Sequence, residues 1–294
     1  MLPAADPAGV VGAGDDPVPG SPGPVVPIRP LTFRELLDLP FALIQANPAA
    51  LAALGGGAVL VAEVVVVLLT ASVARLTDDA DAAIAWTAVL TTLTCAWLVR
   101  VLLRATVVPI ALAAAFGGRT GVRAAVSRAS HLAGPVLLAH ALFTLVGVGV
   151  SVLGILLITL PFVVVWLGYL RGTQFPAPVV LFAEPTTHRQ SVARAKLLTE
   201  GTRWRLTGLW LVQRTLFTLL AVPLFGVMLF VSDITGTHRW PVIVLFTVTG
   251  LVLAAFGEIV ESCARVVCYV DLRRRREGMD IVVPRGGQAR GGSA

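Results

Sequence analysis

Ionisable side chains lie inside long apolar stretches of the sequence, and seven of them are candidate site residues. A charge at the centre of a bilayer costs at least about 2.5 to 3.5 kcal/mol, so such residues pair with one another or serve a ligand. Arginine also grips phosphate well, because its planar fork offers paired hydrogen bonds. The set predicts a salt-bridged packing layer, a cavity for a lipid headgroup or another anion, or a proton or ion pathway. The residues are Glu63, Arg100, Arg104, Arg171, Glu258, Glu261 and Arg265.

The sequence lacks the residue patterns that mark common enzyme reactions. It has no Ser/His/Asp or Cys/His set, no Gly-rich phosphate loop and no HExxH motif. No two cysteines form a CxxC pair, and no histidine stands at metal-ligand spacing. We therefore expect no catalytic residues, no metal and no cofactor, and we expect His140 to bond to a neighbouring helix. The cysteines and histidines are Cys95, Cys263, Cys268, His131, His140, His188 and His238.

The composition indicates a protein that faces lipid. Apolar residues make up 56% of the chain and charged residues 14%, whereas a soluble domain is roughly 25% charged. The mean hydropathy is +0.85. The net charge of +6 comes from arginines between and beside apolar runs, which is typical of topology signals and lipid headgroup contacts. We therefore expect no nucleic-acid partner.

Six apolar runs are long enough to cross a membrane as helices, which takes about 20 residues each. The fold class predicted is therefore an all-α integral membrane protein with about six transmembrane helices. The boundary between the third and fourth runs is the weakest, and a re-entrant pair is the alternative there. Pro109, Pro161 and Pro176 are predicted kinks. The runs cover residues 49–73, 83–116, 132–151, 154–182, 206–231 and 241–270.

Amphipathic segments precede the odd-numbered runs, over residues 32–46, 121–131 and 187–200. Their apolar and charged sides predict helices that lie in the membrane interface or cover a loop. The motif Arg104-Ala-Thr-Val-Val-Pro109 matches Arg171-Gly-Thr-Gln-Phe-Pro176. We therefore predict three parallel repeats, each an interface helix followed by a transmembrane hairpin.

The arginines and lysines gather in the loops of one side, which predicts that this side is cytoplasmic. Both termini then lie in the cytoplasm of a cell whose plasma membrane the chain crosses several times. We predict a disordered tail over 1–30, a membrane domain over 31–280 and a second disordered tail over 281–294. A basic anchor for anionic lipids is predicted at Arg273, Arg274, Arg275 and Arg276.

Several short motifs resemble the bacterial family of the glycerophosphoryl diester phosphodiesterase membrane domain. The resemblance covers about residues 29 to 280. It implies a membrane module that serves lipid or envelope metabolism. In fused members of that family a separate barrel performs hydrolysis, and we expect this chain to lack it. The matching residues are Arg29-Pro30-Leu31-Thr32, Glu35-Leu36-Leu37-Asp38, Asn47-Pro48, Leu198-Thr199-Glu200-Gly201, Trp204-Arg205, Tyr269-Val-Asp271-Leu272-Arg273 and Arg276-Glu277-Gly278 with Asp280.

Together these features predict a membrane scaffold or accessory subunit rather than an enzyme. Its expected partners are membrane lipids, including anionic ones, and an unidentified membrane or cytoplasmic protein bound at the cytoplasmic side. The alternative is a transporter or lipid flippase that uses the intramembrane arginine and glutamate layer as its substrate site.

Overall fold

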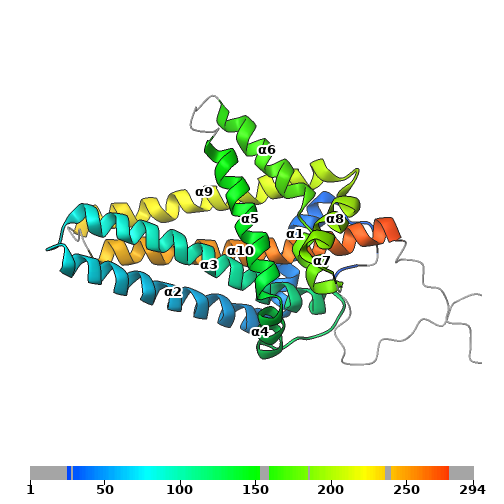
Figure 1. Cartoon of the computed structure of the whole chain (residues 1–294), viewed down its shortest axis with the longest axis horizontal. Helices are drawn as coiled ribbons and strands as arrows, with labels where there is room; N and C mark the ends of the chain where they lie inside the picture. The colour runs from blue at the N-terminus through cyan, green and yellow to red at the C-terminus, as the bar shows by residue number, and fades with distance from the viewer. Residues whose placement is uncertain (1–24, 28, 153–158, 185, 236–239, 278–294) are drawn as a thin grey trace, which may run out of the picture.

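The computed structural model describes residues 25–27, 29–152, 159–184, 186–235 and 240–277 (Figure 1). Regular structure in these residues is entirely helical, as the sequence predicted. The helices are α1 Phe33–Ala46, α2 Pro48–Leu76, α3 Asp81–Ala115, α4 Val122–His131, α5 Ala133–Val152, α6 Leu160–Thr173, α7 Ala177–Ala183, α8 His188–Thr199, α9 Arg203–Thr235 and α10 Trp240–Glu277.

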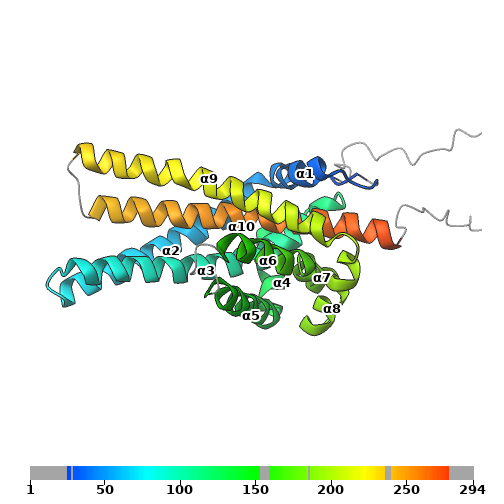
Figure 2. The ribbon, with the colours of Figure 1, turned by 90° about the horizontal axis from the view of Figure 1, so that it is seen from above.

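Four long helices, α2, α3, α9 and α10, lie side by side and form the body of the molecule (Figures 1 and 2). The α2–α3 turn lies at one end of this bundle, and α1, α7 and α8 gather at the other end. Large apolar side chains such as Leu60, Leu219 and Phe230 point outward and are more than half exposed. Such outward apolar faces suit contact with lipid, so the bundle is that of a membrane-embedded protein.

Five of the described helices are long and apolar enough to cross a membrane: α2, α3, α5, α9 and α10. The predicted fourth span, 154–182, is not continuous in the described residues. It is divided into α6 and α7, which are separated where Pro176 begins a new helix. The 14 residues of α6 extend about 21 Å, which is less than the roughly 30 Å hydrocarbon core. A count of six spans is therefore not confirmed.

The helices α5 and α6 lean across the long helices instead of running along them (Figure 1), and Figure 2 views both nearly end-on. Of the three predicted kinks, Pro161 lies in the first turn of α6 and Pro176 lies just before α7. The helix α3 continues through Pro109. Proline fits the first turn of a helix because its missing N–H is not needed there.

The predicted amphipathic segments form α1, α4 and α8, within one or two residues of the expected bounds. Both α1 and α8 begin with a capping box, in which Thr32 pairs with Glu35 and Thr187 pairs with Gln190. Arg29 hydrogen-bonds Glu35 and is the main cause that lowers the pKa of Glu35 to about 2. The order of the elements follows the three predicted units, but the threefold repeat itself stays a prediction.

The chain just before α1 packs against the end of α10. Val26 is fully buried, and its carbonyl accepts a hydrogen bond from Arg274. Leu31 donates its N–H to the Asp271 carboxylate at 2.9 Å. Residues 25–27 of the predicted tail 1–30 are therefore held by α10, while most of that tail and the predicted tail 281–294 lie outside the described residues.

Candidate anion-binding site

Two glutamates on α10 form the centre of a buried cluster of charged side chains. The Glu258 carboxylate is 1% exposed. It accepts two hydrogen bonds from Arg104, at 2.7 and 3.0 Å, and one from Arg100 at 3.0 Å. Both arginines lie on α3, one helical turn apart, so α3 and α10 are joined by a paired, charge-assisted contact.

Glu261, one turn further along α10, is surrounded by arginines from four helices. It accepts hydrogen bonds from Arg214 of α9 and Arg265 of α10, both at 2.5 Å, and from Arg100 at 3.3 Å. Arg171 of α6 is more distant, with 3.7 Å between its Nη1 and Glu261 Oε1. We call these two glutamates and five arginines the charged cluster: Arg100, Arg104, Arg171, Arg214, Glu258, Glu261 and Arg265.

The charged cluster carries more positive than negative charge. Five guanidinium groups share two carboxylates, which leaves three positive charges in excess. The side chains of Arg100 and Arg214 are 25% and 35% exposed, so part of each lies at the protein surface. Arg104, Arg171 and Arg265 are 6%, 16% and 4% exposed, so their charges are largely buried.

Arg171 is the arginine with the weakest pairing. Apart from its 3.7 Å contact with Glu261, its guanidinium lies over the Phe143 ring at 4.2 Å from the centroid. Its Nε is buried without a hydrogen-bond partner, and the Nε of Arg265 is in the same situation. No hydrogen bond from the Arg171 side chain to another described residue is present. A buried donor of this kind costs free energy unless a ligand or water completes it.

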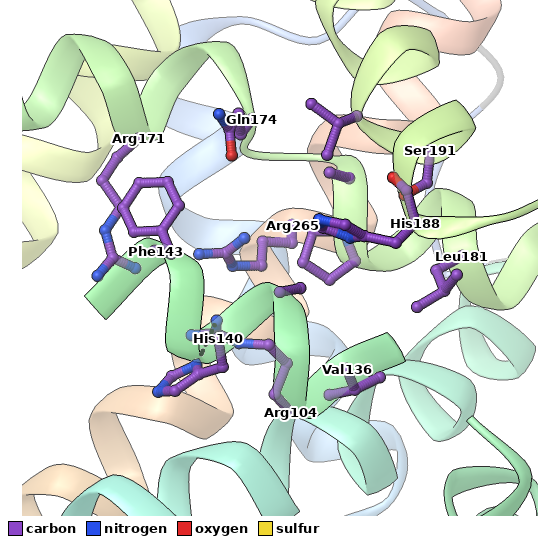
Figure 3. Close-up of a pocket in the computed structure, with 14 residues that line it drawn as sticks. Arg104, Val136, His140, Phe143, Arg171, Gln174, Leu181, His188, Ser191 and Arg265 are labelled. Atoms are coloured by element: carbon purple, nitrogen blue, oxygen red, sulfur yellow. Dashed lines mark hydrogen bonds between the residues drawn. The ribbon is translucent and has the colours of Figure 1, made fainter. Parts of the chain in front are cut away.

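A cavity adjoins these arginines. Its volume is about 50 Å³, room for roughly three to five waters or for one small oxyanion. Arg104, Arg171 and Arg265 reach it from α3, α6 and α10 (Figure 3). Gln174, which follows α6, and His188 and Ser191 of α8 also line it. We call this space the arginine cavity.

His140 of α5 fixes the direction of Arg104. The distance between Arg104 Nη1 and His140 Nδ1 is 3.0 Å, marked by the dashed line in Figure 3. Because a guanidinium group only donates, Nδ1 accepts, and the imidazole is the neutral tautomer with its proton on Nε2. His140 therefore bonds to a neighbouring helix, as the sequence predicted.

The position of Arg171 depends on close contact between α6 and α9. A Cβ built at Gly172 would lie 2.8 Å from Thr207 Oγ1 and 3.1 Å from the Arg203 carbonyl oxygen. At Gly168 it would lie 3.2 Å from the Trp210 ring. Two small residues four positions apart let two helix backbones approach closely. Here Gly168 and Gly172, which flank Arg171 in the sequence, allow α6 to pack closely against α9.

The structure brings together six of the seven predicted site residues. The exception is Glu63, which accepts a hydrogen bond from Thr247 at 2.8 Å. Thr247 lies 11 residues before Glu258 on α10, about 16 Å along the helix axis. Glu63 therefore belongs to a separate α2–α10 contact, and its predicted place in the polar layer is corrected.

Arg214 is the member of the cluster that the sequence analysis missed. It lies within the predicted span 206–231, so the rule that identified the other charged residues in apolar runs would also have selected it. Among the described residues, no group of three or more potential metal ligands is close enough to hold a metal ion.

The four arginines at the end of α10 bond to acidic side chains of α10 itself and to backbone carbonyls of other segments. Arg273 bonds Glu277 at 2.7 Å, and Arg275 bonds Asp271 at 3.0 Å. Arg274 bonds the Val26 carbonyl, and Arg276 bonds the Glu200 carbonyl. These contacts tie α10 to the chain before α1 and to α8, and a lipid-anchoring role for this run stays a prediction.

No protein-family model matches the chain, and no curated protein or solved structure matches it either. The long apolar helices α2, α3, α5, α9 and α10 identify the chain as an all-helical, membrane-embedded protein.

Proposed function

We propose that this protein is a non-enzymatic membrane scaffold or accessory subunit that binds a phosphate-class anion in the arginine cavity. The observation that carries the proposal is Arg171, a largely buried guanidinium beside a cavity, with one carboxylate at 3.7 Å and an unpartnered Nε. A packing layer built only for stability would pair its charges, because an unpaired buried charge is costly.

The chemistry of the cavity fits an oxyanion. Arg104, Arg171 and Arg265 come from three different helices, so an anion between them would offset part of the excess positive charge and join those helices. Gln174 also lines the cavity, and its neutral side-chain amide can donate a hydrogen bond to an anion. Arginine forks bind tetrahedral oxyanions through two parallel hydrogen bonds, and the effect is strongest where water is excluded.

Thermal unfolding in mild detergent tests the proposal. Inorganic phosphate should raise the melting temperature of the wild type relative to chloride at equal ionic strength, since a ligand that binds only the folded state stabilises it. The variant Arg171→Gln should lose this response. The matched control is Arg34→Gln, because Arg34 is 91% exposed on α1, and it should keep the response. An equal shift in all three proteins, or none in the wild type, would overturn the proposal.

The proposed orientation has both termini in the cytoplasm, with the arginine cavity nearer that side. Reporter fusions after Asp81 and Gly149 should both report the outer side. A fusion after Gly149 that reports the inner side would mean that α5 and α6 do not cross.

Membership of the glycerophosphoryl diester phosphodiesterase membrane domain family is likewise a proposal, supported by the motifs around Arg29, Leu198 and Tyr269.

Transport or flipping of the same anion is the alternative function. It predicts that a labelled anionic lipid moves between the leaflets of liposomes that contain the purified wild-type protein. The variant Arg171→Gln should abolish this movement. A scaffold or accessory subunit predicts binding without such movement.

A further inference from the structure

An apolar groove lies along α2 and α3, and α4 and the beginning of α5 close it at one end. Its volume is about 730 Å³. Its walls include Gly57 and Val61 of α2, Val99 of α3, Ala129 of α4 and Val136 of α5. We call it the α2–α3 groove.

The polar atoms of the α2–α3 groove are already satisfied. Thr106 donates its hydroxyl to the Leu102 carbonyl at 2.9 Å, and Ser130 donates to the Ser127 carbonyl at 2.7 Å. No charged residue lines the groove. Its occupant must therefore be apolar, since a polar group placed there would lose its hydrogen bonds to water.

The α2–α3 groove adjoins the arginine cavity. Val136, which is 3% exposed, lines both spaces. On α3, Arg104 lines the arginine cavity while the next two residues, Ala105 and Thr106, line the groove. The charged cavity and the apolar groove therefore border each other at Val136, and a molecule that reached both would have an anionic head and an apolar tail.

We propose that the anion is the headgroup of a membrane lipid whose acyl chain lies in the α2–α3 groove. This inference rests on the proposed function and names the ligand class of the same site. A second groove illustrates the difference, because it runs between α2 and α10, is lined by Gly56 and Ile259, and shares no lining residue with the arginine cavity. That second groove is apolar but has no neighbouring anion site among the described residues, so we expect it to contact bilayer lipids without selecting one.

The two parts of the site contribute differently. Lipid tails are as apolar as the groove, so moving a chain from the bilayer into the groove gives little hydrophobic gain. The arginines therefore supply the affinity for the phosphate group. The groove supplies the selectivity for a phosphate that is attached to an acyl chain. Filling the groove should exclude the lipid and leave free phosphate able to bind.

The glycines of α2 provide a matched pair of variants. A Cβ built at Gly57 or at Gly56 meets no heavy atom within 4 Å, so both positions have room for a side chain. Gly57→Phe fills the α2–α3 groove, whereas Gly56→Phe projects into the second groove. Val61→Trp, at a position that is 63% exposed, fills the α2–α3 groove independently.

The experiment compares two ligands on the same proteins. Dioleoylphosphatidylglycerol is added to detergent micelles, and the lipid retained per protein is measured by native mass spectrometry. Inorganic phosphate is tested separately by thermal unfolding. Wild type and Gly56→Phe should retain one lipid and respond to phosphate. Gly57→Phe and Val61→Trp should each retain at least ten-fold less lipid per protein than the wild type and should keep the phosphate response. Dioleoylphosphatidylcholine, which has no net charge, should be retained far less.

The possible failures are distinguishable. Full lipid retention by both Gly57→Phe and Val61→Trp, with the phosphate response intact, would overturn the lipid inference and leave a site for a soluble anion. Equal loss of lipid from Gly56→Phe would overturn it too, because the effect would not depend on the groove. Absence of a phosphate response in the wild type would instead remove the proposed function on which the inference rests.

Discussion

Removing one charge at a time from the charged cluster separates a packing layer from a binding site. In Glu258→Gln, Arg104 loses the carboxylate that holds it through two hydrogen bonds, and Arg100 loses a third. The Arg104 side chain is 6% exposed, so solvent cannot replace the lost partner. Breaking a buried pair in this way costs about 3 to 5 kcal/mol, which corresponds to roughly 6 to 20 °C in melting temperature.

Arg171→Gln should behave differently. The Arg171 guanidinium contributes a contact with the Phe143 ring at 4.2 Å, worth about 2 kcal/mol, and a distant pairing with Glu261. Removing it also relieves repulsion from Arg104 and Arg265, which line the same cavity. Without an anion we therefore expect less than half of the stability loss that Glu258→Gln produces.

The assay is thermal unfolding of wild type, Glu258→Gln and Arg171→Gln in one detergent, each with and without phosphate. Glu258→Gln removes a negative charge beside the arginine cavity, so it should lose stability but bind phosphate at least as well as the wild type. Arg171→Gln should show the opposite pattern. Equal stability losses in both variants, together with no effect of phosphate on any protein, would refute the reasoning and leave a packing layer.

Three further predictions concern the parts that position the cluster. Gly172→Val should push α6 away from α9, since its Cβ would clash with Thr207, and it should weaken phosphate binding as Arg171→Gln does, whereas Gly226→Val, whose Cβ meets no atom within 4 Å, should not. Because the pKa of Glu35 is lowered to about 2 by Arg29 and the capping contacts, the stability that it gives α1 is full above pH about 4.5 and lost as the pH falls through about 2. The protection factors of α1 amides, that is, their exchange relative to the intrinsic rate at each pH, should fall over that range, and Glu35→Gln should remove this change. Val26→Asp should lower the melting temperature, because it buries a charge against α10.

Much of the fold follows from hydropathy and from capping signals. The apolar runs behind α2, α3, α5, α9 and α10 were predicted to within a few residues at most ends, because lipid allows only closed backbone hydrogen bonding and therefore favours helices. The fourth run was equally apolar but is divided. Apolar composition shows that a segment is removed from water, and it does not distinguish a spanning helix from a short helix packed against others.

The sequence predicted how deep in the membrane the charged cluster lies, but it predicted only some of the residues that form the cluster. Helical spacing placed Glu258, Glu261 and Arg265 on one stripe, and all three do meet in the cluster. Glu63 was assigned to the same layer because it is central in its own run. It lies elsewhere because depth along an axis does not reveal which partner a side chain meets, and Thr247 of α10 is its neighbour.

The break between α6 and α7 connects the sequence motif to the site. The helix α6 ends at Thr173, and Pro176 stands just before α7. In a continuous helix the Val179 N–H would bond the Phe175 carbonyl, but it donates to the Pro176 carbonyl at 2.9 Å, so the Phe175 carbonyl is left without a helical partner. Arg265 donates to that carbonyl at 3.0 Å and lies over the Phe175 ring at 4.8 Å from its centroid. The broken helix therefore holds one cavity arginine from the side, while Arg171, five residues before the proline, supplies another. A continuous helix through this motif would satisfy the Phe175 carbonyl itself and leave Arg265 bonded to Glu261 alone, so the interruption that divides the fourth apolar run also positions Arg265 at the cavity.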